Sequence, residues 1–318
     1  MDLARNVNLN SELAADVMTG LKTHPKYIPS KYFYDATGDR LFQEITELDD
    51  YYLTRCEKEL LTRHHDRLLE LLHDGRPMRL IELGPGDGSK TLALLSSFVS
   101  NKVPITYQPV DISAAILKVL VAQFKQALPT LHVAPLQGDY FQLSYSGHVG
   151  RKVWLYMGSN IGNLDDVQSL ELLSNLNAFA NPGDLLCVGY DLKKSPQAIK
   201  AAYNDAHGVT RQFNLNLLTR LNRELGADFE LDYFDHVPVY DPERGEARSY
   251  LISTRNQVVR LARLNMTVTF EAWETIHTEI SRKYTTRQIS KLALRAGWNH
   301  CEDLKDATQG YAVTIFSA

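Results

Sequence analysis

The sequence predicts an α/β protein in which a parallel sheet is accompanied by a second, smaller domain of α+β type. Short apolar runs typical of buried strands alternate with helical patterns, an order that places helices on both faces of a parallel sheet. After Asp191 this alternation stops, and two polar helices and a β-hairpin are expected instead. A length of 318 residues is sufficient for two such domains.

The first strand of the expected sheet is the apolar run at 78–83. Leucines at helical spacing over residues 57–73 predict a helix before this strand, and Asp74 and Gly75 supply the turn between them. A second helix is expected at 114–128. Further apolar runs predict strands at 105–110, 131–136, 153–158 and 184–190.

The remaining segments define the second domain and a return to the sheet. The pattern at 193–225 predicts two polar helices, and that at 229–254 predicts a hairpin. A helix at 286–298 and a strand at 311–317 are expected to rejoin the sheet. We therefore expect a sheet domain at 57–195 plus 285–318 and a second domain at 1–56 plus 196–284.

Composition and charge argue against several classes of protein. The apolar fraction of 44% and the charged fraction of 23% are ordinary for a globular chain, which argues against disorder. The net charge of −4, without a run of like charges, makes nucleic acid an unexpected partner. The N-terminus lacks a signal-peptide core and no stretch of about 18 apolar residues occurs, so no membrane segment is expected. Cys56, Cys187 and Cys301 are far apart, which is typical of a protein in the reducing cytoplasm.

The most informative local motif is IELGPGDGSK at 81–90, where a strand leads through a glycine-dense turn into a helix. Glycines allow a positive φ and a close approach of the main chain to a ligand. A dinucleotide fingerprint needs G-x-G-x-x-G, but the third glycine comes one residue early, which disfavours a nicotinamide enzyme. A P-loop needs G-x-x-x-x-G-K-[ST], which Gly84 to Thr91 satisfies except at Ser89. A P-loop-like nucleotide hydrolase therefore stays open as an alternative.

The ends of the next two strands distinguish these alternatives. Asp111 follows the second strand, where a carboxylate can accept hydrogen bonds from ribose hydroxyls. A P-loop protein does not need this acid. Gly138, Asp139 and Tyr140 follow the third strand, where a carboxylate can accept a hydrogen bond from an adenine amino group. The three motifs in this order resemble class I methyltransferases, which have a Rossmann-like sheet and use S-adenosylmethionine.

This resemblance implies S-adenosylmethionine as cofactor, S-adenosylhomocysteine as product, and no metal ion. Glu82 either meets the cationic end of the cofactor or braces the loop from behind. Lys90 is either a cofactor-binding lysine or a solvated side chain in the first turn of a helix. The cofactor-binding residues implied are Glu82, Gly84, Gly86, Lys90, Asp111, Asp139 and Tyr140.

Segments outside the cofactor motif carry a more specific resemblance. They are YFYD, LFQEIT and DYYLTR within 32–55, GSNIGN at 158–163, AYNDAHGVT at 202–210, FNLN at 213–216 and TEISRKY at 278–284. In this order, over nearly the whole chain, they resemble the histidine Nα-methyltransferases of ergothioneine biosynthesis. The resemblance implies N-methylation of the α-amino group of a free amino acid, with histidine converted to Nα,Nα,Nα-trimethylhistidine (hercynine). We expect a monomer, with a small amino acid as substrate.

The same resemblance implies which residues bind the amino acid. In the family an asparagine and tyrosines hold the carboxylate, and the matching positions are Asn163, Tyr203 and Tyr51. Tyr34 matches the tyrosine close to the reacting amine, so Tyr34, Asn163 and Tyr203 are the expected catalytic residues. Aromatic side chains also pack in ordinary cores, which is the alternative explanation for each of these tyrosines.

Three further residues are implied at the side chain of the acceptor. Glu279 and Ser281 match the residues that contact the imidazole, and their i, i+2 spacing on an extended segment points both to one face. Ser249 departs from the family pattern, because histidine-specific members place a methionine there. A roomier, more polar pocket leaves another amino acid, such as one with a larger aromatic ring, open as the acceptor. A catalytically silent amino-acid sensor is the more distant alternative.

Overall fold

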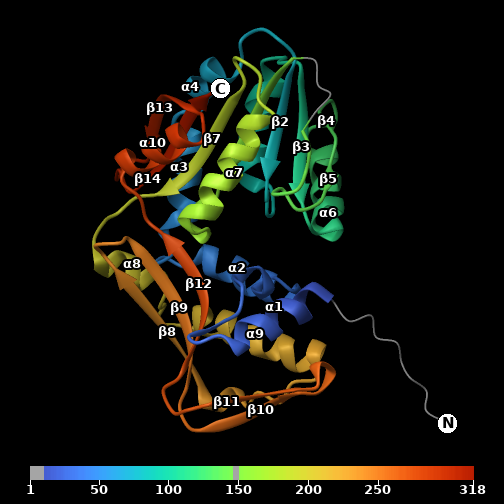
Figure 1. Cartoon of the computed structure of the whole chain (residues 1–318). Coiled ribbons are helices and arrows are strands. Elements are labelled where there is room, and N and C mark those ends of the chain that lie inside the picture. The colour runs from blue at the N-terminus through green and yellow to red at the C-terminus, as the bar shows by residue number, and fades with distance from the viewer. Residues whose placement is uncertain (1–10, 146–149) are drawn as a thin grey trace, which may run out of the picture. The chain divides into compact units, whose positions relative to one another are not determined.

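The computed structural model describes residues 11–145 and 150–318, which belong to two compact units (Figure 1). The sheet unit comprises residues 53–194 and 282–318, and the hairpin unit comprises the chain up to Tyr52 together with residues 195–281. The boundaries predicted from the sequence fall after residues 56, 195 and 284, and those of the structure fall after Tyr52, Lys194 and Ser281. Residues 1–10, on which the expected absence of a signal peptide depends, lie outside the described residues.

The sheet unit is built on an eight-stranded sheet with the order β13-β14-β7-β6-β2-β3-β4, in which β5 also pairs with β3. The pairings of β2 with β3 and β6, of β3 with β4 and β5, and of β6 with β7 are parallel, as predicted. The predicted strand at 131–136 is divided into two short strands. The bounds are Met78–Leu83 (β2), Ile105–Asp111 (β3), His132–Val133 (β4), Leu136–Gln137 (β5), Arg151–Tyr156 (β6), Leu185–Asp191 (β7), Asn299–Lys305 (β13) and Tyr311–Ser317 (β14).

The predicted parallel sheet has an antiparallel C-terminal edge. β14 rejoins the sheet as expected, but it runs antiparallel to β7 and to β13. Residues 306–310 between β13 and β14 are too few for the crossover that a parallel pair requires, so these two strands form a hairpin. β13 was not predicted because most of its residues are polar and only Leu304 is buried, as suits an edge strand.

Helices cover both faces of this sheet, and each face has its own core. Leucines of α3 to α6 pack with Leu80 and Tyr107 on one face, whereas α7 and α10 pack with Ile81 and Trp154 on the other. The predicted helix at 57–73 is divided, because His64 is the N-cap of α4. The bounds are Tyr52–Arg63 (α3), His65–Leu72 (α4), Ser89–Ser100 (α5), Ala114–Ala127 (α6), Asp166–Ala178 (α7) and Thr286–Arg295 (α10).

The hairpin unit has a four-stranded sheet with the order β1-β12-β9-β8 and a separate ribbon of β10 and β11. The predicted hairpin is confirmed: β8 and β9 are antiparallel, and Asp241 pairs with Glu246 next to the turn. The strands of the ribbon were not predicted, and of β12 only an extended segment at Glu279 and Ser281 was expected. The strand bounds are Lys26–Tyr27 (β1), Phe234–Asp241 (β8), Glu246–Ser253 (β9), Gln257–Leu261 (β10), Met266–Phe270 (β11) and Thr275–Arg282 (β12).

The helices of this unit differ from the prediction in their burial. α9 was expected to be polar, but it is the central helix of the core, with Phe213, Leu217 and Leu221 fully or almost fully buried. Two of its polar residues, Asn214 and Asn216, are also buried, and both are hydrogen-bonded. The helix bounds are Ser11–Lys22 (α1), Ala36–Glu47 (α2), Pro196–Ala202 (α8) and Val209–Leu225 (α9), with a 3-10 turn at Ser30–Phe33 (η1).

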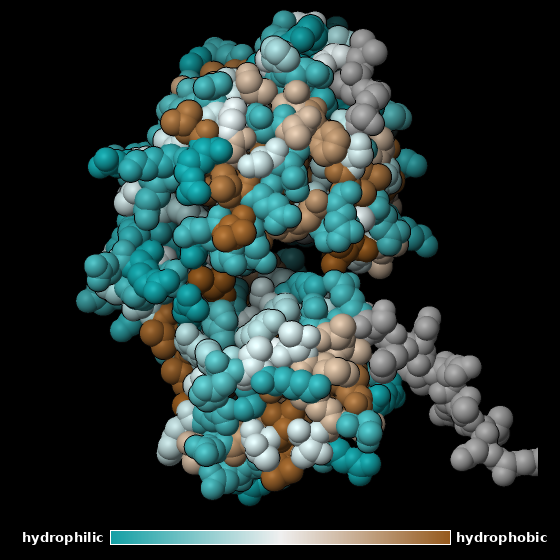
Figure 2. All heavy atoms as spheres, viewed as in Figure 1, coloured by the Kyte–Doolittle hydropathy of each residue, from teal (hydrophilic) through white to brown (hydrophobic). Residues whose placement is uncertain are grey.

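The visible surface is mostly polar, with apolar side chains scattered among charged ones (Figure 2). Such scattering is ordinary for a folded chain and marks no extended apolar patch on this face. In the described part of the chain, every helix is too short or too polar to cross a membrane.

Candidate active site

The glycine turn between β2 and α5 leaves room beside its main chain. Gly84, Gly86 and Gly88 have φ angles of 64°, 60° and 70°, in the region that favours glycine. A Cβ atom on Gly88 would lie 2.8 Å from the ring of Phe124, so this residue is fixed against α6. A Cβ atom on Gly86 would meet no heavy atom within 4 Å. The turn is therefore held from behind and open in front, where a ligand can approach the peptide groups.

The two predicted acids lie beside this turn. The Gly84 N–H donates to Val110 O at 2.9 Å, and the Gly138 N–H donates to Asp111 O at 3.0 Å, so neighbouring strands end at one edge. One carboxylate oxygen of Asp111 accepts from the Ser113 N–H at 2.8 Å, and burial raises the pKa of this carboxyl. The Asp139 carboxylate accepts from the Phe141 N–H at 2.9 Å and is exposed.

Glu82 lies behind the turn and is 3% exposed. Its carboxylate accepts from the Thr91 hydroxyl at 2.5 Å and from the Tyr107 hydroxyl. Burial raises its pKa to about 7 although both hydrogen bonds act in the opposite direction. These contacts join β2 to α5 and β3, and they favour the loop-bracing alternative for Glu82.

Lys90 is not merely a solvated lysine, because its ammonium forms an ion pair with Glu57. Burial lowers the pKa of Lys90, but the charge and hydrogen bond of Glu57, together with the charges of Glu82 and Asp87, outweigh it, and the net direction is upward. Glu57 is fully buried on α3 and was missed by the sequence analysis. Nothing local distinguishes it from the other acidic residues of a leucine-rich helix.

Asn163 and Tyr140 also belong to the sheet unit. Asn163 ends the 3-10 turn Asn160–Asn163 (η2), which follows β6 through Ser159 in the left-handed conformation. Gly162 fits closely here, since a Cβ atom would lie 2.8 Å from Arg282 O. Among residues 11–145 and 150–318, no hydrogen bond involves the side-chain amide of Asn163. The Tyr140 hydroxyl lies 3.4 Å from that of Tyr156, and burial raises its pKa.

In the hairpin unit, three predicted tyrosines lie along one row of aromatic rings. Tyr34, which is 42% exposed, packs edge-on against Phe42 with ring centroids 5.6 Å apart. Phe42 contacts Tyr51 at 6.3 Å, and Tyr51 contacts Tyr203 at 6.5 Å. The row ends at a buried hydrogen bond, in which the Tyr203 hydroxyl donates to Ser281 Oγ at 2.7 Å.

The residues predicted at the acceptor side chain adjoin this row. β12 carries both Glu279 and Ser281, on the extended segment that was expected. Ser249 of β9 is 1% exposed, and its Oγ lies 3.5 Å from Glu279 Oε2, at the outer limit of a hydrogen bond. The structure thus brings together six of the predicted residues in one unit. They are Tyr34, Tyr51, Tyr203, Ser249, Glu279 and Ser281.

Other side chains hold this arrangement in place, and their roles were not predicted. The Thr278 hydroxyl donates to the buried Asn214 side chain at 3.0 Å, which fixes β12 against α9. The Asn216 amide donates at 2.8 Å to Asp35, the N-cap of α2. Asp205 accepts from the Thr210 N–H at 2.7 Å, which anchors the start of α9. Such long-range framework contacts have no signature in local sequence.

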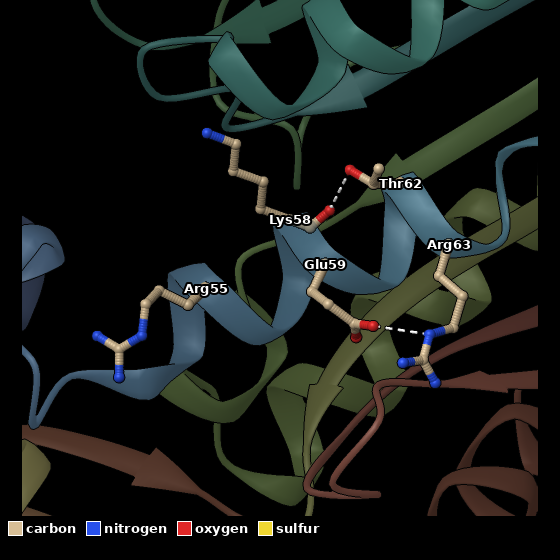
Figure 3. A pocket seen from close by; sticks show the side chains of 5 residues that line it. All are labelled: Arg55, Lys58, Glu59, Thr62 and Arg63. Carbon is tan, nitrogen blue, oxygen red and sulfur yellow. Dashed lines mark hydrogen bonds and ion pairs between the residues drawn. The ribbon is translucent and has the colours of Figure 1, made fainter.

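A surface hollow lies along α3 and is a separate feature (Figure 3). Its Glu59 carboxylate pairs with Arg63 at 2.7 Å, so part of its charge is neutralised internally. The hollow is lined by Arg55, Lys58, Glu59, Thr62 and Arg63. None of these residues was predicted to bind a ligand. No group of three or more His, Cys, Asp or Glu side chains among the described residues could hold a metal ion.

The parallel sheet, its glycine turn and the acids after neighbouring strands define a Rossmann-like methyltransferase. The solved CcbJ methyltransferase from Streptomyces caelestis shares this fold, with a TM-score of 0.50 at 15% identity over 90% of this chain and 99% of that chain. Residues 13–318 match the family model described as "Histidine-specific methyltransferase, SAM-dependent", and the chain belongs to this family. It is therefore an enzyme that uses S-adenosylmethionine, which sets aside the nucleotide hydrolase.

Two bacterial relatives are similar over nearly their whole length. The histidine N-alpha-methyltransferase of Mycolicibacterium smegmatis is 37% identical over 286 residues, which cover 90% of this chain and 88% of that protein. The protein of the same name from Mycobacterium tuberculosis is 35% identical over 304 residues, covering 95% and 94%. The likeness includes both units rather than the cofactor motif alone.

Proposed function

We propose that this methyltransferase methylates the α-amino group of free histidine and converts it to Nα,Nα,Nα-trimethylhistidine. The observation that carries the proposal is the cluster in the hairpin unit, where Tyr203 is bound to Ser281 and Glu279 lies beside Ser249. Phenols and hydroxyls donate hydrogen bonds without charge, and one carboxylate can accept an N–H from an imidazole. Family membership supports the same acceptor.

The residues at the carboxyl edge of the sheet fit the cofactor by the chemistry of their donors and acceptors. Asp111 accepts hydrogen bonds from the ribose hydroxyls, and Asp139, next to Tyr140, accepts one from the adenine amino group. Gly84 and Gly86 allow the main chain to approach the cofactor, and Gly86 has the open space that this requires. Lys90 supplies a positive charge for a carboxylate, while Glu82 keeps the turn in shape.

The acceptor residues mainly bind and orient the amino acid. Tyr51, Tyr203 and Asn163 hold its carboxylate through neutral donors, Glu279 and Ser281 hold the imidazole, and Tyr34 lies near the amine. When bound, the cofactor supplies a methyl group on a sulfonium with a neutral thioether as leaving group. Alignment of the amine with this methyl group can contribute several kcal/mol, so no strong base is needed. The amine must be neutral to react, and the rate is expected to rise with pH until it is.

Ser249 favours a second candidate acceptor. A small hydroxyl in place of the methionine of histidine-specific members enlarges the pocket around Glu279, which suits an aromatic amino acid such as tryptophan. Both candidates need the same cofactor site and the same carboxylate-binding residues. They differ only in which ring is held beside Glu279 and Ser281.

One experiment tests the proposal. The purified enzyme is incubated with S-adenosylmethionine and each of the twenty amino acids separately, and the products are identified by mass. We expect histidine to react fastest and to acquire one, two and then three methyl groups. Faster methylation of an aromatic amino acid would establish the second candidate. A product that stops at one methyl group would contradict trimethylation.

We also infer that the enzyme acts as a monomer in the cytoplasm. The thiols of Cys56, Cys187 and Cys301 are unpaired in the structure, which suits a reducing compartment. Light scattering at assay concentration tests the monomer, since a mass of twice 36.0 kDa would contradict it.

A further inference from the structure

The buried carboxylate of Glu57 joins three segments at the carboxyl edge of the sheet. Its Oε1 accepts from the Gly158 N–H at 2.7 Å and from the Tyr311 hydroxyl at 2.5 Å. Its Oε2 forms the ion pair with Lys90, in the first turn of α5. Glu57 thus connects α3 with the helix that follows the glycine turn, with the segment that leads to Asn163, and with β14.

The structure compensates the charge of this buried carboxylate and leaves space for it. A buried charge is costly unless it is paired and hydrogen-bonded, and both conditions are met here. Gly189 of β7 leaves the space that the carboxylate occupies. A Cβ atom there would lie 2.7 Å from Glu57 Oε1 and 2.5 Å from the Tyr311 hydroxyl oxygen, so this position requires a glycine. The position of the carboxylate is therefore fixed from several sides.

A second buried ion pair of the same unit shows what is distinctive about this one. Asp184 and Lys152 pair at the start of β7 and β6, and their side chains are 2% and 6% exposed. Lys90, in contrast, is 22% exposed while Glu57 is fully buried. An ammonium has three N–H donors, so a lysine held by one carboxylate can still bind a second anion.

We propose that Glu57 is a positioning residue of the cofactor site, which holds the Lys90 ammonium beside the glycine turn so that it meets the carboxylate of S-adenosylmethionine. The inference rests on the proposed cofactor site. Glu57 does not touch the cofactor, and it acts through Lys90. The hydrogen bonds from Gly158 and Tyr311 keep the carboxylate in the orientation that places the lysine.

The test is a double-mutant cycle read out by the Kd for S-adenosylhomocysteine, measured by calorimetry. Glu57→Gln keeps the shape and an oxygen that accepts hydrogen bonds but removes the charge, and we expect Kd to rise about tenfold, the scale of one charge-assisted hydrogen bond. Lys90→Met is expected to raise Kd at least as much. Adding Glu57→Gln to Lys90→Met should then have no further effect, because the two residues act as one unit.

Asp184→Asn is the matched control, since it also removes a buried carboxylate that pairs with a lysine and accepts main-chain N–H groups. It should lower Tm and leave the Kd unchanged. Tyr311→Phe removes only one hydrogen bond to Glu57 and nearly conserves shape. We expect it to raise Kd about two- to threefold, and it tests the inference even where Glu57→Gln does not fold. At saturating cofactor, kcat of both Glu57→Gln and Tyr311→Phe should stay within about twofold of the original.

Two results would overturn the inference while leaving the cofactor site in place. One is an unchanged Kd in both Glu57→Gln and Tyr311→Phe when Lys90→Met weakens binding. The other is a Glu57→Gln effect that is as large in the Lys90→Met background as in the original chain. An unchanged Kd in Lys90→Met has a different meaning. It would show that Lys90 does not bind the carboxylate of the cofactor, and the role proposed for Glu57 would then also be wrong.

Discussion

The two units of this enzyme hold their polar side chains by different physical means. In the sheet unit, two carboxylates are buried near the glycine turn. Thr91 and Tyr107 donate hydrogen bonds to Glu82, and Lys90 forms an ion pair with Glu57. In the hairpin unit, the central contact of the proposed acceptor cluster joins the neutral hydroxyls of Tyr203 and Ser281. The glycine turn therefore has carboxylates and a lysine behind it, whereas this cluster is centred on uncharged hydroxyls, with the Glu279 carboxylate beside Ser249.

This difference suits the two ligands. The cofactor has permanent charges that a preorganised lysine and acids can match. The amine of the acceptor must instead lose a proton before it reacts, and a carboxylate close to it would favour its charged form. The neutral phenols that we propose for the acceptor site avoid this penalty. If the contrast is correct, a substitution at the glycine turn changes the affinity for the cofactor, and a substitution in the hydroxyl cluster of the hairpin unit changes the affinity for the acceptor.

The largest effect is expected at the glycine turn. Gly88→Val places a branched side chain at φ 70°, with its Cβ atom 2.8 Å from Phe124 and 3.0 Å from Leu120. Left-handed strain and overpacking together should reduce the free energy of unfolding by about 2–5 kcal/mol. We expect the Kd for S-adenosylhomocysteine to rise at least tenfold, while the Kd for histidine is unchanged, both measured by calorimetry.

Gly75→Ala is the control for strain alone, since Gly75 has a φ of 89° and a Cβ atom there would meet nothing within 4 Å. It lies in the turn before β2, at the opposite end of that strand. We expect the free energy of unfolding to fall by about 1 kcal/mol and the Kd for S-adenosylhomocysteine to stay unchanged. Equal loss of cofactor affinity in both variants would show that the turn acts through stability only.

The next effect is the pH dependence conferred by Glu82. Its pKa is raised by burial from 4.5 to about 7, so the folded protein keeps a proton that the unfolded chain releases between these values. The free energy of unfolding should therefore fall as pH rises from about 4.5 to 7, by about 3 kcal/mol, and change no further above that. Urea denaturation at pH 5 and pH 8 measures the fall, and Glu82→Gln should remove this share of it. A fall of the same size in Glu82→Gln would assign it to other groups.

The sequence alone predicted that the glycine turn and the two acids lie at one edge of the sheet, because these signals are local. The glycine turn occupies 81–90, and Asp111 and Asp139 each follow a strand, so the parallel order of strands places them at one edge. The polar edge strand β13 was missed, since an exposed strand lacks the apolar run by which buried strands are found. That error also concealed the antiparallel edge of the sheet.

The sequence could not predict the contacts that hold the site together. Glu57 is 33 positions from Lys90, 101 from Gly158 and 254 from Tyr311, so no spacing rule connects them. The acceptor residues are similar: Tyr203 and Ser281 are 78 positions apart. Their role is predicted by resemblance to a family, and only the folded chain shows that Tyr203 contacts Ser281. Physically, these pairs form because distant elements pack, not because neighbouring residues prefer a conformation.

In the hairpin unit, Tyr203→Phe should have an effect on one ligand only. It removes the hydroxyl that donates to the buried Ser281 Oγ. The lost hydrogen bond is worth about 1–2 kcal/mol. We expect kcat/KM for histidine to fall about 10- to 30-fold, with the Kd for S-adenosylhomocysteine unchanged. Tyr32→Phe is the matched control, because it removes a phenol hydrogen bond to Asp16, and it should leave kcat/KM for histidine unaltered. Equal losses in the two variants would contradict a specific role for Tyr203.

The smallest effect is expected at Ser249. Its Oγ lies 3.5 Å from Glu279 Oε2, too far for a strong hydrogen bond, so Ser249→Ala should change kcat/KM for histidine by no more than about twofold. Glu279→Gln, which removes the charge that we propose accepts the imidazole N–H, should lower the same constant about tenfold. Steady-state kinetics of both variants with histidine and tryptophan separate the two side chains. If Ser249→Ala costs more than Glu279→Gln, the hydroxyl rather than the carboxylate holds the ring, and the acceptor pocket is built on neutral groups throughout.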